Sequence, residues 1–129
     1  MPVVLDTSAL LASLYGEPGK LRVDAVLLGG EACWSAVNYA EFATKCCAGG
    51  MTADEVELIA AAYELRVVPF DAPLALATGA LRNATRHLGL SLGDRACLAL
   101  GQQLGATVLT ADRAWSALEI GITIECIRP

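Results

Sequence analysis

Two acidic residues follow short apolar runs of the sequence, in positions from which carboxylates can bind a metal ion. Asp6 comes directly after the run VVL, and Asp112 follows TVL after the pair Thr110-Ala111. If the two runs are neighbouring parallel strands, their acids meet at the carboxyl edge of one sheet, where a cation or a proton must neutralise the like charges. Either acid could instead cap the helix that begins at Thr7 or at Arg113, and position alone leaves both interpretations open.

Two further acids lie within helical patterns. Glu41 lies two turns into a largely apolar helix, where it faces either a polar pocket or the solvent, and an ion pair with Lys45 is the structural alternative. Asp94 lies in the first turn of a later helix, and its spacing from Ser91 also fits a capping box. Gly93 allows a backbone or a ligand to approach closely. Each acid taken alone therefore has a structural explanation as well as a functional one.

Short β-branched runs alternate with longer helical patterns along the chain. We predict strands over Pro2–Leu5, Ala32–Trp34, Val67–Phe70, Thr107–Leu109 and Thr123–Ile127. We predict helices over Thr7–Tyr15, Pro18–Leu28, Ser35–Ala48, Thr52–Leu65, Asp71–Leu88, Ser91–Leu104 and Arg113–Leu118. The alternation predicts an α/β fold with one domain over residues 1–129, in which helices flank both faces of a central parallel five-stranded sheet. Pro69 predicts an edge position for the third strand.

The charge of the chain limits how it could bind nucleic acid. The net charge is −5, so a generic basic coat for nucleic acid is excluded. If four carboxylates bind metal, the remaining charge is −5 + 4 = −1, and one or two divalent cations would supply positive charge where a phosphate must lie. The acidity is therefore compatible with a metal-dependent nuclease.

The composition also indicates where such a protein works. No apolar run approaches the roughly 20 residues of a membrane span, and no signal peptide is visible, so we expect a cytoplasmic protein without membrane association. The five cysteines form no C-x-x-C pair, and in a chain that is 55% hydrophobic we expect buried thiols rather than disulfides or a zinc site.

Four stretches of the sequence, taken together, resemble the PIN-domain nucleases and in particular the VapC-type toxins of toxin–antitoxin modules. These stretches are VLDTS at residues 4–8, NYAE at 38–41, SLGD at 91–94 and LTAD at 109–112. The resemblance extends over almost the whole chain, including RACLALG at 95–101 and GATVLT at 105–110. It implies a Mg²⁺- or Mn²⁺-dependent endoribonuclease that uses one or two ions, and its catalytic and metal-binding residues would be Asp6, Glu41, Asp94 and Asp112.

The chemistry expected from these residues is hydrolysis of a phosphodiester by a metal-activated water, which leaves a 5′-phosphate. The only histidine, His87, lies near a predicted helix end, so a mechanism with paired histidines is excluded. Several neighbours of the four acids could support them. Thr7, Ser8, Asn38 and Thr110 could orient ligands or water, or bond to nearby backbone instead. Arg95 and Arg113 each follow a proposed ligand and could contact substrate phosphate or pair with acids.

The resemblance further implies three partners: an RNA substrate, an antitoxin protein and a second copy of the chain in a homodimer. The apolar helices Pro18–Leu28 and Thr52–Leu65 are candidate surfaces for the protein partners, although the core needs such helices equally. One alternative is a binding module that has this fold without catalysis. A phosphatase of the haloacid-dehalogenase kind is disfavoured because Ser8 occupies the position of its second Asp, and a receiver domain is disfavoured because no lysine follows a late strand.

Overall fold

The computed structural model describes residues 1–129 and contains one parallel sheet of five strands in the order β3-β2-β1-β4-β5. The strands are β1 (Val3–Leu5), β2 (Ala32–Ser35), β3 (Arg66–Val68), β4 (Thr107–Thr110) and β5 (Ile124–Cys126). The predicted α/β fold with a parallel five-stranded sheet is confirmed. The predicted edge position of the third strand is also confirmed, because β3 is the first strand of the order.

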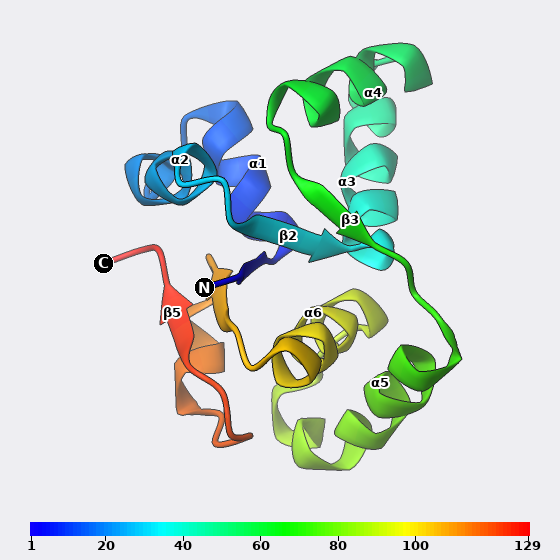
Figure 1. Ribbon diagram of the computed structural model, residues 1–129, viewed down its shortest axis with the longest axis vertical. Coiled ribbons are helices and arrows are strands. Elements are labelled where there is room, and N and C mark those ends of the chain that lie inside the picture. Colours follow the sequence, from blue (N-terminus) through cyan, green and yellow to red (C-terminus); the bar gives the residue numbers. More distant parts are fainter.

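Helices cover both faces of this sheet, with α1 and α2 on one side and α5 and α6 on the other (Figure 1). The helices are α1 (Thr7–Tyr15), α2 (Lys20–Leu28), α3 (Ala36–Ala48), α4 (Ala53–Ala62), α5 (Ala72–Ala84) and α6 (Leu92–Leu104), with the short 3-10 helices η1 (Arg86–Leu88) and η2 (Arg113–Ala117). None of these helices combines the length and the apolar character needed to cross a membrane.

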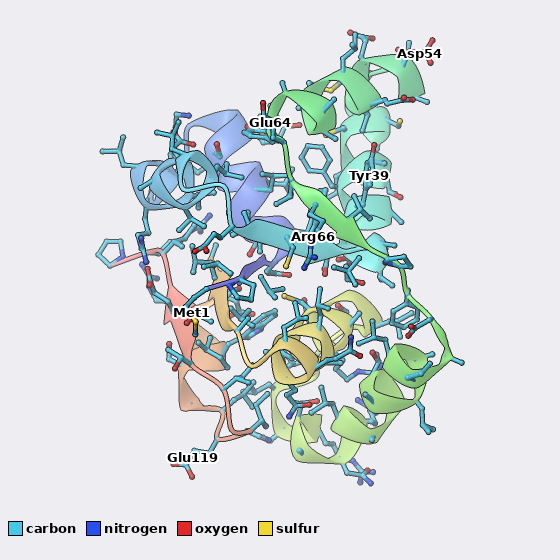
Figure 2. All side chains as sticks on the ribbon, in the orientation of Figure 1. Met1, Tyr39, Asp54, Glu64, Arg66 and Glu119 are labelled. Carbon is cyan, nitrogen blue, oxygen red and sulfur yellow. The ribbon has the colours of Figure 1, made fainter.

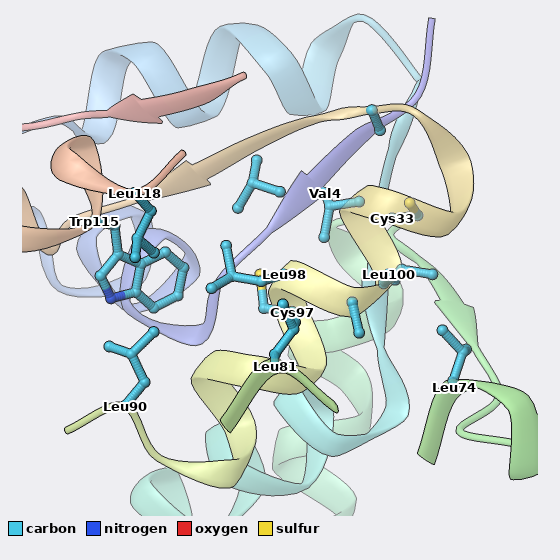
Figure 3. Close-up of a cluster of buried hydrophobic side chains, with 13 residues drawn as sticks. Val4, Cys33, Leu74, Leu81, Leu90, Cys97, Leu98, Leu100, Trp115 and Leu118 are labelled. Atoms are coloured by element: carbon cyan, nitrogen blue, oxygen red, sulfur yellow. The ribbon is translucent and has the colours of Figure 1, made fainter. Parts of the chain in front are cut away.

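Two hydrophobic clusters lie on the two sides of the sheet, because successive residues of a strand point to opposite faces. In β1, Val4 belongs to the cluster beneath α5 and α6, whereas Leu5 belongs to the cluster beneath α1 to α4. Figure 3 shows the first cluster, in which Trp115 packs near Leu90 and Leu98. In the second cluster Trp34 stacks on Tyr39, with ring centroids 5.5 Å apart. The sheet is thus fixed from both sides, and its carboxyl edge has a defined geometry.

The helix predicted over Asp71–Leu88 was too long. Helix α5 ends at Ala84, and η1 follows it. Thr85 donates its hydroxyl hydrogen back to the carbonyl of Leu81, and its own carbonyl accepts from the amide of Leu88. The chain therefore tightens into 3-10 geometry at a helix end whose last carbonyls need donors.

Other predicted boundaries also differ from the structure. The third strand begins at Arg66 and ends at Val68, because the following Pro69 has no amide hydrogen for the ladder. Helix α4 ends at Ala62, and the chain leaves it through Glu64, which has a left-handed φ of 53°. The last predicted helix is the 3-10 helix η2. All five cysteines are free thiols, but the expectation of burial is wrong for two of them, since Cys47 is exposed and Cys126 is half-buried.

Candidate active site

The carboxyl edge of the sheet brings the first and the last of the four acids to neighbouring strands. Strand β1 pairs with β4 in parallel, and the amide of Asp6 donates to the carbonyl of Leu109 over 2.9 Å. The amide of Asp112 donates to Thr110 Oγ1 over 3.1 Å, and this hydroxyl donates to Asp6 Oδ2 over 3.1 Å. The pairing of β1 with β4, on which the sequence argument depended, is therefore present.

The carboxylate of Asp6 is buried and faces into the fold instead of capping α1. It is 4% exposed, it makes no cap bond although Asp6 occupies the N-cap position, and Ser8 Oγ donates to its Oδ2 over 2.6 Å. The pKa of Asp6 is raised from 3.8 to about 6, mainly by burial; the charges of Asp94 and Glu41 also raise it, while the hydroxyls of Ser8 and Thr110 oppose the rise. No lysine, arginine or histidine forms an ion pair with it.

Glu41 turns its carboxylate toward α1 and α6. Thr7 Oγ1 lies 3.0 Å from Glu41 Oε1, and Asn38 Nδ2 donates to the same oxygen over 3.2 Å. The alternative ion pair with Lys45 is absent from the structure. The carboxylate lies so close to the Cα of Gly93 that a Cβ there would overlap with it. Glu41 is therefore a half-buried acid enclosed by polar donors and by the first turn of α6.

Asp94 forms the capping box that its spacing predicted. Its Oδ2 accepts from the amide of Ser91 over 3.0 Å, and its own amide donates to Ser91 Oγ over 3.2 Å. The bond engages one carboxylate oxygen only. The negative charge of Asp94 is nevertheless close enough to Asp6 to raise its pKa, as the charge of Glu41 does. Capping and membership of an acidic cluster are thus compatible at this residue.

Asp112 is the outlying member of the four acids. It is exposed, and its Oδ1 accepts from the amide of Ala114 over 2.9 Å, which caps η2. The charges of Asp94 and Glu41 raise the pKa of Asp6, whereas Asp112 is not among the charges that do so. Local backbone donors hold Asp94 and Asp112 in their cap positions, so no three acids of the chain converge into a metal-ligand group.

The donor set nevertheless fits a hard divalent cation. It consists of carboxylate and hydroxyl oxygens, which suit Mg²⁺ or Mn²⁺, and no cationic side chain of the protein neutralises it. A proton or a cation is the remaining means of offsetting the charge of Asp6 among its acidic neighbours.

The residues that flank the acids divide into two groups. Thr7, Ser8, Asn38 and Thr110 each contact a carboxylate of Asp6 or Glu41. The two arginines bond elsewhere: Arg95 Nη1 donates to the carbonyl of Thr78 in α5, and Arg113 Nε donates to the carbonyl of Pro129. Neither arginine forms an ion pair with an acid. The roles of all six in catalysis or substrate binding stay predictions.

Cys97 is a neighbour of the site that the sequence analysis did not connect with the acids. It is fully buried on α6, one turn after Asp94. Burial raises the pKa of its thiol well above the ordinary value, and the charges of Asp6, Asp94 and Glu41 add to this effect. The three-residue spacing from Asp94 on one helix was the available signal.

Comparison with known proteins agrees with this architecture. A family model described as PIN domain matches residues 3–120. Among similar solved structures, VapBC2 from Rickettsia felis bound to a DNA fragment from their promoter has 17% identity and a TM-score of 0.74, covering 97% of this chain and 98% of that chain. DNA-bound VapBC from Salmonella typhimurium has 20% identity and a TM-score of 0.73 over 98% of both chains. VapBC-1 from nontypeable Haemophilus influenzae has 17% identity and a TM-score of 0.72 over 98% of both chains. A search of curated proteins gave no significant match.

Proposed function

We propose a function for this chain on the basis that it belongs to the PIN-domain family. The proposal is that it is a metal-dependent endoribonuclease and the toxin of a type II toxin–antitoxin module. PIN domains are generally nucleases, so membership of the family supports hydrolysis of nucleic acid. The observation that carries the proposal is the buried carboxylate of Asp6, which lies near Glu41 and Asp94 without a cationic partner from the chain.

The residues at the carboxyl edge prepare this cluster for a cation. We propose that Asp6, Glu41, Asp94 and Asp112 are its ligands, and a bound Mg²⁺ or Mn²⁺ would supply charge relief on the phosphate and activation of water. Ser8 and Thr110 both donate to Oδ2 of Asp6, so they fix the rotation of the carboxylate and leave Oδ1 without a side-chain donor. The amide of Ala111 in turn donates to Ser8 Oγ over 3.0 Å, which ties this arrangement to the end of β4.

The similar solved structures support the proposal of a protein partner. Several are described as VapBC complexes, and another, from Klebsiella pneumoniae, is described as a toxin–antitoxin complex. We therefore propose that this chain binds a cognate antitoxin. We also propose that it works in the cytoplasm and forms a homodimer. The choice of RNA as the substrate derives from the resemblance of the acidic motifs to VapC-type toxins.

A cleavage assay with total RNA tests the proposal directly. The purified chain should cleave RNA with Mg²⁺ or Mn²⁺ and not with a chelator, and Asp6→Asn should reduce the rate at least about 100-fold. Asp71→Asn is the matched control, since Asp71 is also an acid at a helix N-cap but caps the exposed start of α5. Equal cleavage by wild type and Asp6→Asn would refute the assigned site. A wild-type chain that neither binds Mn²⁺ nor cleaves RNA would favour a binding module without catalysis.

A further inference from the structure

A buried amide joins three helices beside the acidic cluster. Asn38, in the first turn of α3, is fully buried. Its Nδ2 lies 3.2 Å from each of three oxygens: Glu41 Oε1 on the same helix, Thr7 Oγ1 on α1 and the carbonyl oxygen of Gly93 on α6. Helix α3 packs against both α1 and α6, and the bonds of this amide reach both of these helices.

The orientation of this amide follows from its surroundings. If the Asn38 amide were flipped by exchanging Oδ1 and Nδ2, Oδ1 would point at the Glu41 carboxylate and at the Gly93 carbonyl. Neither of these groups can donate a hydrogen bond. In the observed orientation both hydrogens of Nδ2 have acceptors, while the buried Oδ1 has no hydrogen-bond partner. A buried acceptor without a donor is unfavourable, and such groups in native proteins call for a specific explanation.

The contacts of Asn38 also set the spacing between two of the proposed metal ligands. Its amide holds Glu41 Oε1 and the carbonyl of Gly93 at the same nitrogen, and the Glu41 carboxylate packs directly on Gly93. Asp94 is the next residue along α6. Thr7 Oγ1 also lies 3.0 Å from Glu41 Oε1, but of these two side chains only Asn38 bonds to both Glu41 and the first turn of α6, so it links the position of Glu41 to that of Asp94.

We propose that Asn38 is a positioning residue, which holds Glu41 beside the first turn of α6 so that Glu41 and Asp94 can bind the same divalent cation. This inference rests on the proposed function, since it assigns both acids to one metal site. In this assignment Asn38 acts through Glu41 and is not itself a metal ligand. Residues that orient metal ligands typically change metal affinity about 10- to 100-fold when they are replaced.

A double-mutant cycle on Mn²⁺ binding tests the inference. Mn²⁺ affinity is measured from loss of the free-ion electron paramagnetic resonance signal for wild type, Asn38→Ala, Glu41→Gln and the double variant. We expect Asn38→Ala to weaken Mn²⁺ binding about 10- to 100-fold in the wild-type background, and by no more than about twofold when Glu41 is already replaced. Asn38→Leu, which retains side-chain volume, should show the same pattern and guards against poor folding of the alanine variant.

Thr85→Val is the matched control for the loss of a buried hydrogen bond away from the acids. Thr85 is 1% exposed and donates to the carbonyl of Leu81 in α5. The control should lower the unfolding temperature without changing Mn²⁺ affinity, which separates a positioning role from a structural one.

The outcomes distinguish this inference from the proposed function. The inference would be overturned if Asn38→Ala changed Mn²⁺ affinity equally in the wild-type and Glu41→Gln backgrounds. It would also be overturned if both Asn38 variants kept the wild-type Mn²⁺ affinity. Either result would count against it even if the wild type cleaves RNA. Coupled losses of Mn²⁺ binding in a protein that cleaves no RNA would support the positioning role and refute the nuclease. A wild type without Mn²⁺ binding would overturn both.

Discussion

The acids of this protein occupy two kinds of environment, one on α2 and β5 and one at the carboxyl edge of the sheet. Asp24 lies 2.9 Å from Lys20 Nζ, and Glu125 lies 2.6 Å from Arg22 Nε. Burial raises the pKa of Asp24, but hydrogen bonds from Lys20 and Ser13 outweigh it, and the bond from Arg22 lowers that of Glu125. At the carboxyl edge, burial raises the pKa of Asp6 to about 6.

The difference lies in where the countercharge comes from. On α2 and β5 the chain supplies cations to its own acids, in pairs that are partly exposed to solvent. At the carboxyl edge it supplies only hydroxyl and amide donors, although the charges of Asp94 and Glu41 raise the pKa of Asp6 there. Elsewhere on the surface, the N-terminal amine of Met1 (Figure 2) also pairs with an acid, Glu31. The acids at the carboxyl edge thus have no positive countercharge from the chain, which agrees with the proposed metal site.

Removing the charge of Asp6 should stabilise the protein in the absence of divalent metal. Because its pKa is raised to about 6 in the folded state, the folded state binds the proton more tightly than the unfolded state does, and stability falls as pH rises from about 4 to about 6. The rise from 3.8 to about 6 corresponds to at most about 3 kcal/mol. Asp6→Asn should therefore be more stable than wild type at pH 8, but not at pH 4. Urea unfolding at the two pH values, with a chelator present, measures this difference in stability.

Asp24→Asn is the contrasting control for this measurement. Its pKa is lowered in the folded state, so its charge contributes stability that is present above the unfolded pKa and is lost as pH falls through the folded value. This variant should be less stable than wild type at pH 8. If Asp6→Asn were also less stable at pH 8, the two environments would not differ in the manner described.

Gly93→Ala should damage the acidic edge with little effect on stability. The added methyl group overlaps with the Glu41 carboxylate, which is the flexible end of a side chain and can turn away. Mn²⁺ binding should weaken about 10- to 100-fold. Loss of the hydrogen bonds to Glu41 should lower the stability by about 1 kcal/mol, and the higher helix propensity of alanine should raise it by about the same amount. Gly79→Ala in α5, where a Cβ meets nothing within 4 Å, should leave Mn²⁺ binding unchanged. Equal Mn²⁺ affinities in the two alanine variants would contradict the proposed role of Glu41.

The smallest effect is expected at the exposed pair of Arg22 with Glu125. Arg22→Gln should cost less than about 1 kcal/mol of stability, because the pair is accessible to solvent, and the cost should shrink at high salt. Urea unfolding at two ionic strengths measures this, with Mn²⁺ binding recorded in parallel. A clear loss of Mn²⁺ affinity would mean that the α2 and β5 acids are not independent of the carboxyl edge.

Local signals along the chain predicted much of the fold. The capping box that the spacing of Ser91 and Asp94 predicted begins α6. The helices predicted from Thr52 and Asp71 also begin there, where Thr52 forms a second capping box and Asp71 caps α5. These signals succeed because a cap is decided within about three residues of the helix start. Helix and strand ends were predicted less well, since at Thr85 and at Pro69 the end depends on which backbone donors remain available.

Sequence position alone determined that Asp6 and Asp112 follow strands and that Asp94 lies in the first turn of a helix. It also placed Glu41 within a helix, and it left two interpretations for each acid. The folded structure gives each residue a different environment. The cap bonds of Asp94 and Asp112 form because their donors are neighbours in the chain, and at Asp94 the cap bond coexists with membership of the acidic cluster. Asp6 is not a cap, because Thr110, 104 residues away, reaches its carboxylate once β1 and β4 pair. Glu41 is not paired with Lys45, because α1 and α6 bring Thr7 and Gly93 to it. Contacts between distant segments exist only in the folded chain, so the charge environment of the site was a property that only the tertiary structure could decide.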